Sequence, residues 1–349
     1  LQQVPYIAMY YAPTYYEYQA NWFIAKMFNT PIQINVRLPD FSVPFHRRNE
    51  LDGLLIKNDE EIPIEIKSFP LSKKDVEIIQ KKYKKMHFYN IIIVAPKVPE
   101  NINYAFSFIP NEKVIRNFYE NWSPNLTEGI ISELANGKHH FRYKLLRRSE
   151  HKNTRFLNQV DKRIKSIETL KKDILRTPKS SPPVRVYWST HRWLDPKGLY
   201  YKNQRSYILG GLLVFDIDGS KIHKSYFDCV INKNGLCEYC FRYAKIHTQR
   251  LLNLLQEESR ISNLEVWFSG RQGFHIYAFS DTYCDSYYRK NILNKIIQEK
   301  IIVDDVVTSD QKRIITFPGT LHAYSLRKVQ FVKNLKNFRL NMVNYETNI

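Results

Sequence analysis

Residues 210–220, GGLLVFDIDGS, constrain the fold of this chain more than any other segment. They form an apolar run that ends in two aspartates, Asp216 and Asp218, one residue apart. Because alternate residues of a β-strand share a face, both carboxylates project from the same side of the strand. Their negative charges repel unless a cation lies between them, so the pattern predicts a metal site. The alternative interpretation is a strand end whose aspartates cap the following turn.

A second segment, WFSGRQGFHIY at 267–277, supplies groups that bind phosphate. A strand leads to Ser269, a Gly-Arg-x-Gly turn allows the backbone to approach a ligand closely, and the next strand carries His275 inward. With Arg271, these residues combine a hydroxyl, an imidazole, a guanidinium and exposed amides, which suit a triphosphate. A structural hairpin contains any one of these groups, but seldom all of them.

A third segment, residues 306–328, supplies a further carboxylate. Asp310 follows an apolar stretch that the pattern predicts as a strand, and the basic residues Arg313 and His322 come after it. Two Mg²⁺ ions would need this third carboxylate, because Mg²⁺ uses few protein oxygens and fills its other positions with water and substrate phosphate.

The order of these motifs resembles the catalytic core of the archaeo-eukaryotic primase superfamily, over residues 183–330. In that family the aspartates of the first and third motifs bind catalytic Mg²⁺ or Mn²⁺; here they correspond to Asp216, Asp218 and Asp310. The nucleotide-contacting residues of that family correspond to Ser269, Arg271, His275, Arg313 and His322. The resemblance implies nucleotidyl transfer from nucleoside triphosphates on a single-stranded DNA template.

The four cysteines indicate a metal site rather than a disulfide framework, since three of them lie within a dozen residues. Cys237-x-x-Cys240, with Cys229 as a third thiolate, fits a structural zinc site whose fourth ligand is His223 or, in competition, His247. A lone CxxC is as often core or redox chemistry. The resemblance supports zinc, because primase small subunits carry a zinc stem in this insertion, whereas end-joining polymerases typically lack it.

A second carboxylate cluster lies in the first half of the chain, at NELDGLLIKNDEEIPIEIKSF, residues 49–69. Alternation places Glu65 and Lys67 on one face of a strand, and a hairpin would bring Asp52 beside them. A metal held by Asp52 and Glu65 would activate water while Lys67 stabilises the hydroxide. The alternative is a solvated face, which is what charges at alternate strand positions usually mark.

This second cluster resembles the PD-(D/E)xK nuclease superfamily over residues 10–100. The resemblance implies that Glu17 is the upstream acid, which joins Asp52 and Glu65 at a nuclease-like Mg²⁺ site. Gln80 and Tyr83 are similar to the extra motif of some members. The customary proline is absent, because Leu51 precedes Asp52. Such a domain is either an active nuclease or a DNA-binding platform.

The expected fold class is α/β (α+β) in three parts. Residues 1–125 are predicted as a three-layer PD-(D/E)xK-like domain. Residues 126–182 are predicted as a basic helical connector that ends at the breaker sequence RTPKSSPPVR. Residues 183–349 are predicted as the primase catalytic core with its zinc-binding insertion.

Charge and hydropathy limit the choice of partners. The net charge of +19, together with 24 Tyr, 20 Phe and 5 Trp, favours a polyanion with bases for stacking, although a coding bias toward Lys, Ile, Asn and Tyr explains part of the excess. No apolar run approaches the ~20 residues that span a bilayer, and the start does not match a secretory signal. We therefore expect a cytoplasmic protein without a membrane partner. The fusion of the two domains, by resemblance alone, implies a prokaryotic (archaeal), plasmid or viral origin, such as a mobile element.

The sequence thus predicts a DNA primase or primase-polymerase fused to a nuclease-like domain. It would act with a helicase or an accessory helical primase domain. One alternative is an end-joining or gap-filling repair polymerase. Another is a nuclease or DNA-binding replication factor with an inactive primase core. The preference for ribonucleotides or deoxynucleotides stays open.

Overall fold

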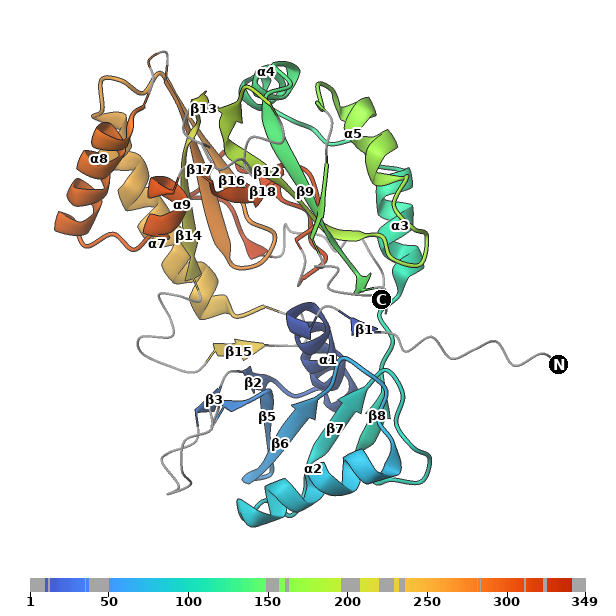
Figure 1. Ribbon diagram of the computed structural model, residues 1–349. Helices are drawn as coiled ribbons and strands as arrows, with labels where there is room; N and C mark the ends of the chain where they lie inside the picture. Colours follow the sequence, from blue (N-terminus) through green and yellow to red (C-terminus); the bar gives the residue numbers. More distant parts are fainter. Residues whose placement is uncertain are drawn as a thin grey trace. The chain divides into compact units, whose positions relative to one another are not determined.

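The computed structural model describes residues 10–11, 13–34, 36–37, 50–148, 157–160, 163–195, 208–219, 229–231, 236–280, 282, 284–310, 312–322 and 325–340. The chain divides into two compact units (Figure 1). Unit 1 comprises Leu1–Asn111, Leu146–Phe156 and Tyr226–Cys237. Unit 2 comprises Glu112–Leu145, Leu157–Ser225 and Glu238–Ile349.

Unit 1 is built on a six-stranded mixed sheet in the order β15-β2-β5-β6-β7-β8. Its strands are β2 (Ile32–Ile34), β5 (Gly53–Lys57), β6 (Glu60–Ile66), β7 (Ile92–Ala95), β8 (Ala105–Ser107) and β15 (Cys229–Ile231). The pairs β6–β7 and β7–β8 are parallel and the others antiparallel. Two further pairs are β1 (Tyr10–Tyr11) with β10 (Arg147–Arg148) and β3 (Val36–Arg37) with β4 (Glu50–Leu51). The hairpin predicted to bring Asp52 beside Glu65 is confirmed in the antiparallel pair β5–β6.

Helix α2 (Lys73–Lys85) covers one face of this sheet (Figure 1). It begins at a capping box in which Ser72 and Asp75 satisfy each other's backbone amides. Its buried side chains Ile79 and Tyr83 pack in one core with Ile93 of β7. Helix α1 (Pro13–Phe28) contacts β2, β6 and β15. The apolar spacing of α2 thus places Tyr83 against the face of the sheet that carries Glu65.

Strand β15 was not predicted from the sequence. It follows the Asp216–Asp218 strand in the chain, yet pairs antiparallel with β2 of unit 1, Cys229 opposite Ile34. Unit 1 therefore ends at residue 111 in its first segment and includes two later segments, and in this it differs from the contiguous 1–125 domain expected above.

Unit 2 contains two antiparallel sheets. One has the order β11-β9-β12-β13, with β18 also paired to β12, and the other has the order β14-β17-β16-β19. The first comprises β9 (His139–Leu145), β11 (Leu157–Gln159), β12 (Pro183–Trp193), β13 (Ile208–Gly211) and β18 (Ile314–Thr316). The second comprises β14 (Leu213–Asp218), β16 (Asn263–Phe268), β17 (Gly273–Phe279) and β19 (Gln330–Phe331).

The alternation in β14 separates a core face from a polar face. Phe215 and Ile217 join a hydrophobic core with α7 (Glu238–Gln256) and α8 (Ser286–Gln298), which lie on that side of the sheet (Figure 1). On the opposite face, Tyr277 of β17 lies 6.1 Å from Trp188 of β12 between ring centroids. The polar face of β14 therefore belongs to the side that meets the β12 sheet.

The prediction of a helical connector at residues 126–182 is wrong. Helices α4 (Glu128–Ala135) and α5 (Ile167–Ile174) are present, but β9 lies between them and pairs with β12, while β11 extends the same sheet. The side chains of Phe141 and Tyr143 are buried at alternate positions of β9. Pairing with a strand some forty residues away overrides the local helical pattern. Helix α3 (Glu112–Glu120) begins unit 2.

The predicted strand before Asp310 is also wrong. Residues Asp305–Ser309 form the short helix α9, and Asp310 is its C-cap. The Thr308 hydroxyl donates to the Val214 carbonyl at 2.9 Å, and the Asp304 amide donates to the Asp216 carbonyl at 2.7 Å. These tertiary hydrogen bonds hold a β-branched segment in helical form against β14. Within the described ranges, no helix has the length and apolar character to cross a membrane.

Candidate active sites

Asp216 and Asp218 lie on the polar face of β14, as the alternation predicts. In the register of the sheet, Asp216 is opposite His275 and Asp218 is opposite Gly273 of β17. His275 Nε2 lies 3.8 Å from Asp216 Oδ1. The side chain of Asp216 is 26% exposed, whereas that of His275 is 2% exposed. The strand therefore presents its carboxylates to solvent beside a buried imidazole.

The turn between β16 and β17 needs both of its glycines. The Ser269 amide donates to the Gly273 carbonyl at 3.0 Å and closes the turn. Gly270 has φ +92°, and a Cβ there would lie 2.5 Å from the Cβ of His322. A Cβ at Gly273 would lie 2.3 Å from the Ile217 carbonyl oxygen. The glycines therefore allow the turn to pack directly against β14 and the His322 segment.

Two buried histidines adjoin this turn. Burial, with the charge of Arg185, lowers the pKa of His275 to about 3. Burial, with the charges of Arg185 and Arg271, holds the pKa of His322 well below its ordinary value. Both imidazoles are thus neutral at pH 7, while guanidinium groups beside them stay charged. An anionic ligand would find a positive field and polar ring nitrogens here.

Arg185 and Lys144 are site residues that the sequence analysis missed. Arg185, on β12, donates from Nε to the Thr316 hydroxyl, and its charge acts on both buried histidines. Burial, with the charge of Arg185, lowers the pKa of Lys144 on β9, and the Lys144 charge also acts on His322. In the sequence, Arg185 could have been noticed as the one basic residue within the otherwise apolar stretch PVRVYW.

Asp310 lies at the end of α9, and its side chain is 41% exposed. Its Oδ2 is 3.5 Å from Arg313 Nε, and its Oδ1 accepts from the Lys312 amide at 3.0 Å. Ser269 and Arg271 lie in the β16–β17 turn, where Ser269 is buried and Arg271 half-buried. Within the described ranges, no three His, Cys, Asp or Glu side chains form a group that could hold a metal. The structure thus places Asp216 and Asp218 on one strand face and Asp310 on a neighbouring helix end.

Arg289 of α8 fixes the position of α9 relative to β14. It is 1% exposed and donates to three backbone carbonyls: Leu212 at 3.0 Å, Cys284 at 3.0 Å and Thr308 at 3.2 Å. Leu212 immediately precedes β14, the strand that carries Asp216, and Thr308 precedes Asp310 by two residues. No local pattern indicates this role, because an arginine in a polar helix usually faces solvent.

The zinc ligands are only partly within the described residues. His223 lies outside them, and Cys229 is described by its backbone in β15. Cys237 and Cys240 are buried thiols without a disulfide. His247, the competing ligand, accepts a hydrogen bond from the Ile302 amide at 3.1 Å. The zinc site stays a prediction.

The hairpin of β5 and β6 brings Asp52, Glu65 and Lys67 together in unit 1. Asp52 Oδ2 accepts from the Ile66 amide at 2.7 Å, and the Lys67 ammonium donates to Glu65 Oε1. Tyr83 of α2 donates to Glu65 Oε2 at 2.5 Å, and Lys82 Nζ lies 3.5 Å from the same oxygen. Each oxygen of Glu65 therefore has a donor or a cation.

The two carboxylates of unit 1 differ in proton affinity. Burial and the charge of Glu65 raise the pKa of Asp52. Burial acts to raise the pKa of Glu65 as well, but Lys67 and the Tyr83 hydroxyl outweigh it, and the net shift is downward. A proton in this pair therefore resides on Asp52.

The remaining residues predicted for this site are less closely involved. Asn21 of α1 donates to the Asp52 carbonyl at 2.8 Å, and Glu17 is half-buried on the same helix. Glu17 is not gathered with Asp52 and Glu65 into a three-carboxylate group. Gln80 is exposed on α2. Gly53 leaves room for the Asn21 side chain, since a Cβ there would lie 2.2 Å from its Oδ1.

Comparison with known proteins places the chain near primases. No family model matches it. A DNA primase small subunit PriS from Thermococcus sibiricus is 29% identical over 175 residues, which is 49% of this chain and 48% of that protein. One from Pyrobaculum calidifontis is 27% identical over 46% of this chain and 62% of that protein. About half of the chain is thus similar to primase small subunits, and it spans about half the length of the first of these relatives.

A solved structure gives a weaker match. The polymerase domain from Mycobacterium tuberculosis Ligase D in complex with DNA aligns with 65% of this chain and 83% of that chain, with 12% sequence identity and a TM-score of 0.38. So low a TM-score does not establish a shared fold, and the sequence relatives are the informative comparison.

Proposed function

We propose that unit 2 is a template-dependent nucleotidyltransferase of the primase and primase-polymerase class. The observation that carries the proposal is the pair Asp216 and Asp218 on one strand face, with Asp216 opposite His275 and beside the Ser-Gly-Arg-x-Gly turn. The sequence similarity to primase small subunits supports it. Its substrates would be nucleoside triphosphates and single-stranded DNA.

The carboxylates of unit 2 fit divalent cations in donor chemistry. Asp216, Asp218 and Asp310 supply hard oxygen ligands, which Mg²⁺ and Mn²⁺ prefer, and the side chains of Asp216 and Asp310 are partly open to solvent. Bound there, two such ions would activate a 3′-hydroxyl and stabilise the charge of the departing pyrophosphate. His275, buried and neutral, would orient the Asp216 carboxylate from its Nε2.

The nucleotide would bind through the groups around the turn. Ser269 and Arg271 would hold its phosphates, with His322 behind the turn and Arg313 at the end of α9. Arg185 and Lys144 add positive charge from the β12 sheet, where low solvent access strengthens their attraction for a triphosphate. Because these cations already lie in place, little reorganisation accompanies binding.

The test uses unprimed single-stranded DNA, labelled nucleotides and Mn²⁺ or Mg²⁺. We expect short products that fall about a thousandfold or more in an Asp216→Ala/Asp218→Ala variant, because the loss of metal ligands removes several kcal/mol of stabilisation. Glu65→Ala, a carboxylate change in the other unit, is the matched control and should synthesise normally. Failure to extend even a primed template would overturn the assignment.

The runner-up for unit 2 is an end-joining or gap-filling polymerase. A gapped duplex with a 5′-phosphate, offered in competition with unprimed single strand, distinguishes the two, because only the repair enzyme would prefer the gap. A structural zinc bound by Cys229, Cys237, Cys240 and His223 would favour the primase. About one zinc per chain in the purified protein, lost in Cys237→Ser but kept in Cys284→Ser, would support that site.

A second candidate function belongs to unit 1. The cluster of Asp52, Glu65 and Lys67 has the groups of a metal-dependent nuclease, and the hairpin brings them together. Asp52 and Glu65 would hold Mg²⁺, which would supply an activated water, and Lys67 would stabilise the attacking hydroxide. If instead the cluster only stabilises the sheet, unit 1 is a DNA-binding platform.

Nuclease activity is tested on end-labelled single-stranded and duplex DNA with Mn²⁺. We expect cleavage that is lost, by about a hundredfold or more, in Glu65→Gln, because a neutral amide is a poor ligand for a divalent cation. Glu61→Gln, an exposed carboxylate on the same strand, is the matched control. Equal cleavage by the unsubstituted protein, Glu65→Gln and Glu61→Gln would mean that a contaminant cleaves the DNA, and would reject this function.

A further inference from the structure

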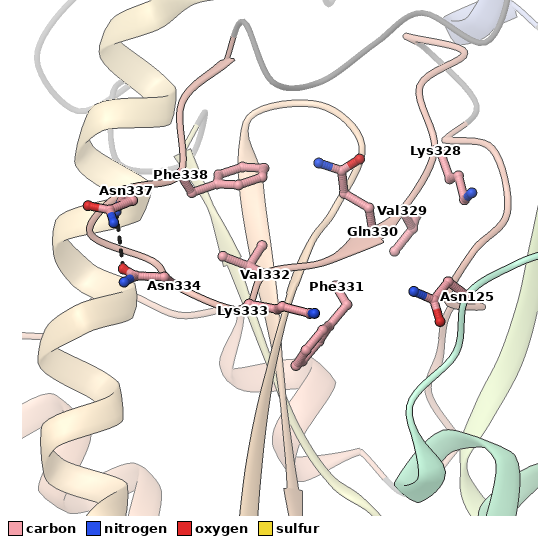
Figure 2. Close-up of a pocket in the computed structure, with 10 residues that line it drawn as sticks. All are labelled: Asn125, Lys328, Val329, Gln330, Phe331, Val332, Lys333, Asn334, Asn337 and Phe338. Atoms are coloured by element: carbon pink, nitrogen blue, oxygen red, sulfur yellow. Dashed lines mark hydrogen bonds between the residues drawn. The ribbon is translucent and has the colours of Figure 1, made fainter.

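A cavity of about 490 Å³ lies along β19 of unit 2 (Figure 2). Its lining contains no acidic side chain. It contains two lysines, Lys328 and Lys333, and four amides, Asn125, Gln330, Asn334 and Asn337. The cavity is thus positively charged and rich in groups that both donate and accept hydrogen bonds.

An aromatic side chain also lines the cavity. Phe331 is half-buried, and its ring centroid lies 5.4 Å from that of Trp267 on β16. Trp267 is itself fixed, since its indole nitrogen donates to Glu265 Oε2 at 3.1 Å and Glu265 accepts from Thr127 as well. Phe331 therefore rests on a rigid support, which is what a stacking platform requires.

The register of the sheet relates this cavity to the catalytic carboxylates. Phe331 is opposite Trp267, Trp267 is opposite His275, and His275 is opposite Asp216. Directly opposed residues in antiparallel strands project from the same face. Three interstrand spacings of about 4.8 Å separate Phe331 from Asp216, or roughly 14 Å. This distance corresponds to a few nucleotides of a single strand, whose spacing per nucleotide, when the strand is extended, exceeds the ~3.4 Å of a duplex.

We propose that this cavity binds the single-stranded DNA template a few nucleotides from the nucleotide that is copied. Phe331 stacks on a base, the amides contact base edges, and Lys328 and Lys333 neutralise the flanking phosphates. The cavity volume suits one nucleotide, and the exposed Lys333, Asn334 and Asn337 leave room for the strand to continue. This inference rests on the proposed function of unit 2.

Single-stranded DNA fits the cavity better than a free nucleoside triphosphate does. The triphosphate-binding groups lie around His275 and Arg271, whereas this cavity has two lysines at its rim and neither histidine nor arginine in its lining. Two separated positive charges match phosphates on either side of a base. The amides, which suit every base edge, fit binding that is tolerant of sequence.

Binding is measured by fluorescence anisotropy with a labelled 20-nucleotide single strand, without divalent metal. We expect Lys333→Glu to weaken binding about tenfold and to lower the salt slope by about 0.7 or more. Lys336→Glu makes the same charge change three residues away and outside the lining; it should change affinity about twofold or less. Phe331→Ala should weaken binding about tenfold through lost stacking, with an unchanged salt slope.

Photocrosslinking locates the strand. With 5-iodouracil placed at successive template positions of a primed template, crosslinks to residues 328–338 should peak a few nucleotides from the copied position and not at the copied base itself. Equal effects of Lys333→Glu and Lys336→Glu, or no effect of either, would overturn the proposal, since binding would then follow net charge alone.

The two proposals fail separately. Normal primer extension with unchanged binding by Lys333→Glu rejects the template site and leaves the polymerase assignment intact. Weakened binding by Lys333→Glu in a protein that extends no primer rejects the polymerase assignment and retains a single-strand site.

Discussion

The two units place carboxylates beside basic groups in opposite ways. In unit 1, Glu65 has Lys67 on one oxygen and Tyr83 on the other, so the cluster satisfies itself within the fold. In unit 2, Asp216 is partly exposed and lies 3.8 Å from the buried, neutral His275. Asp310 is also partly exposed and lies 3.5 Å from Arg313 Nε. Glu65 of unit 1 is thus buried and fully hydrogen-bonded, whereas the carboxylates of Asp216 and Asp310 in unit 2 stay accessible to a ligand.

This difference indicates where ligand binding contributes most. Removing one partner from a self-satisfied, buried cluster destabilises the folded chain, because the other charge is left buried and unpaired. Partly exposed charges contribute little to folding but can interact with ligands that carry both signs, such as a metal-bound triphosphate. Substitutions in unit 1 should therefore change stability first, and those at the exposed groups of unit 2 should change activity first.

Arg289 belongs to unit 2, yet its substitution should change stability first. This is the largest effect on stability that we expect. Arg289→Met leaves three buried carbonyls without this donor, so we expect the free energy of unfolding of unit 2 to fall by about 3–5 kcal/mol. Lys290→Met, the exposed neighbour, is the matched control, with a change of about 0.5 kcal/mol or less. The measurement is urea unfolding of both variants.

Primer extension shows whether Arg289 positions the active site in addition to stabilising the fold. At temperatures where Arg289→Met stays folded, primer extension should still fall, because α9 and β14 lose their common tie. Full extension by the folded variant would mean that Asp310 and Asp216 are positioned by other contacts, such as the Thr308 hydroxyl on Val214.

Sequence patterns predicted the parts of both sites that local alternation determines. The strands carrying Asp216, His275 and Glu65 follow period-two patterns, and the hairpin bringing Asp52 to Glu65 is a short-range contact. The two-glycine turn before His275 was evident for the same reason. In each case, neighbours in the sequence set the geometry.

Long-range contacts decided what the sequence did not reveal. Strand β9 takes its conformation from β12, α9 from hydrogen bonds to β14, and β15 from β2 of unit 1. Arg185 and Lys144 act on the histidines only because distant strands bring them close. None of these relations leaves a period in the local sequence, so they became visible only in the folded chain.

A substitution of intermediate effect tests the self-satisfied character of unit 1. Tyr83→Phe removes the hydroxyl that donates to the buried Glu65 oxygen, and we expect unit 1 to lose about 2 kcal/mol of unfolding free energy. Tyr89→Phe, at a residue that is 76% exposed, is the control and should be neutral. Hydrogen exchange of β5 and β6 reports the change. An unaltered stability would show that Lys67 and Lys82 alone suffice for Glu65.

The smallest effect that we expect is a difference between the two units in how their stability changes at acidic pH. Burial and the charges of Arg289 and His139 lower the pKa of His191 in unit 2 to about 3. Between pH 6.5 and about 3 the unfolded chain binds a proton that folded His191 does not, so stability falls as pH decreases through that window. In unit 1 the pKa of Glu65 is lowered and that of Asp52 is raised, so their contributions partly cancel.

Unit 2 should therefore lose protection against hydrogen exchange from about pH 6.5 downward, while unit 1 keeps its protection to lower pH. His191→Asn should flatten the response of unit 2 by up to about 1.4 kcal/mol per pH unit, relative to the exposed control His87→Asn. An identical slope in both variants would assign the acid response to other groups. Parallel losses in both units would remove the electrostatic contrast between them, because the buried imidazole would then cost no more than the paired carboxylates of unit 1.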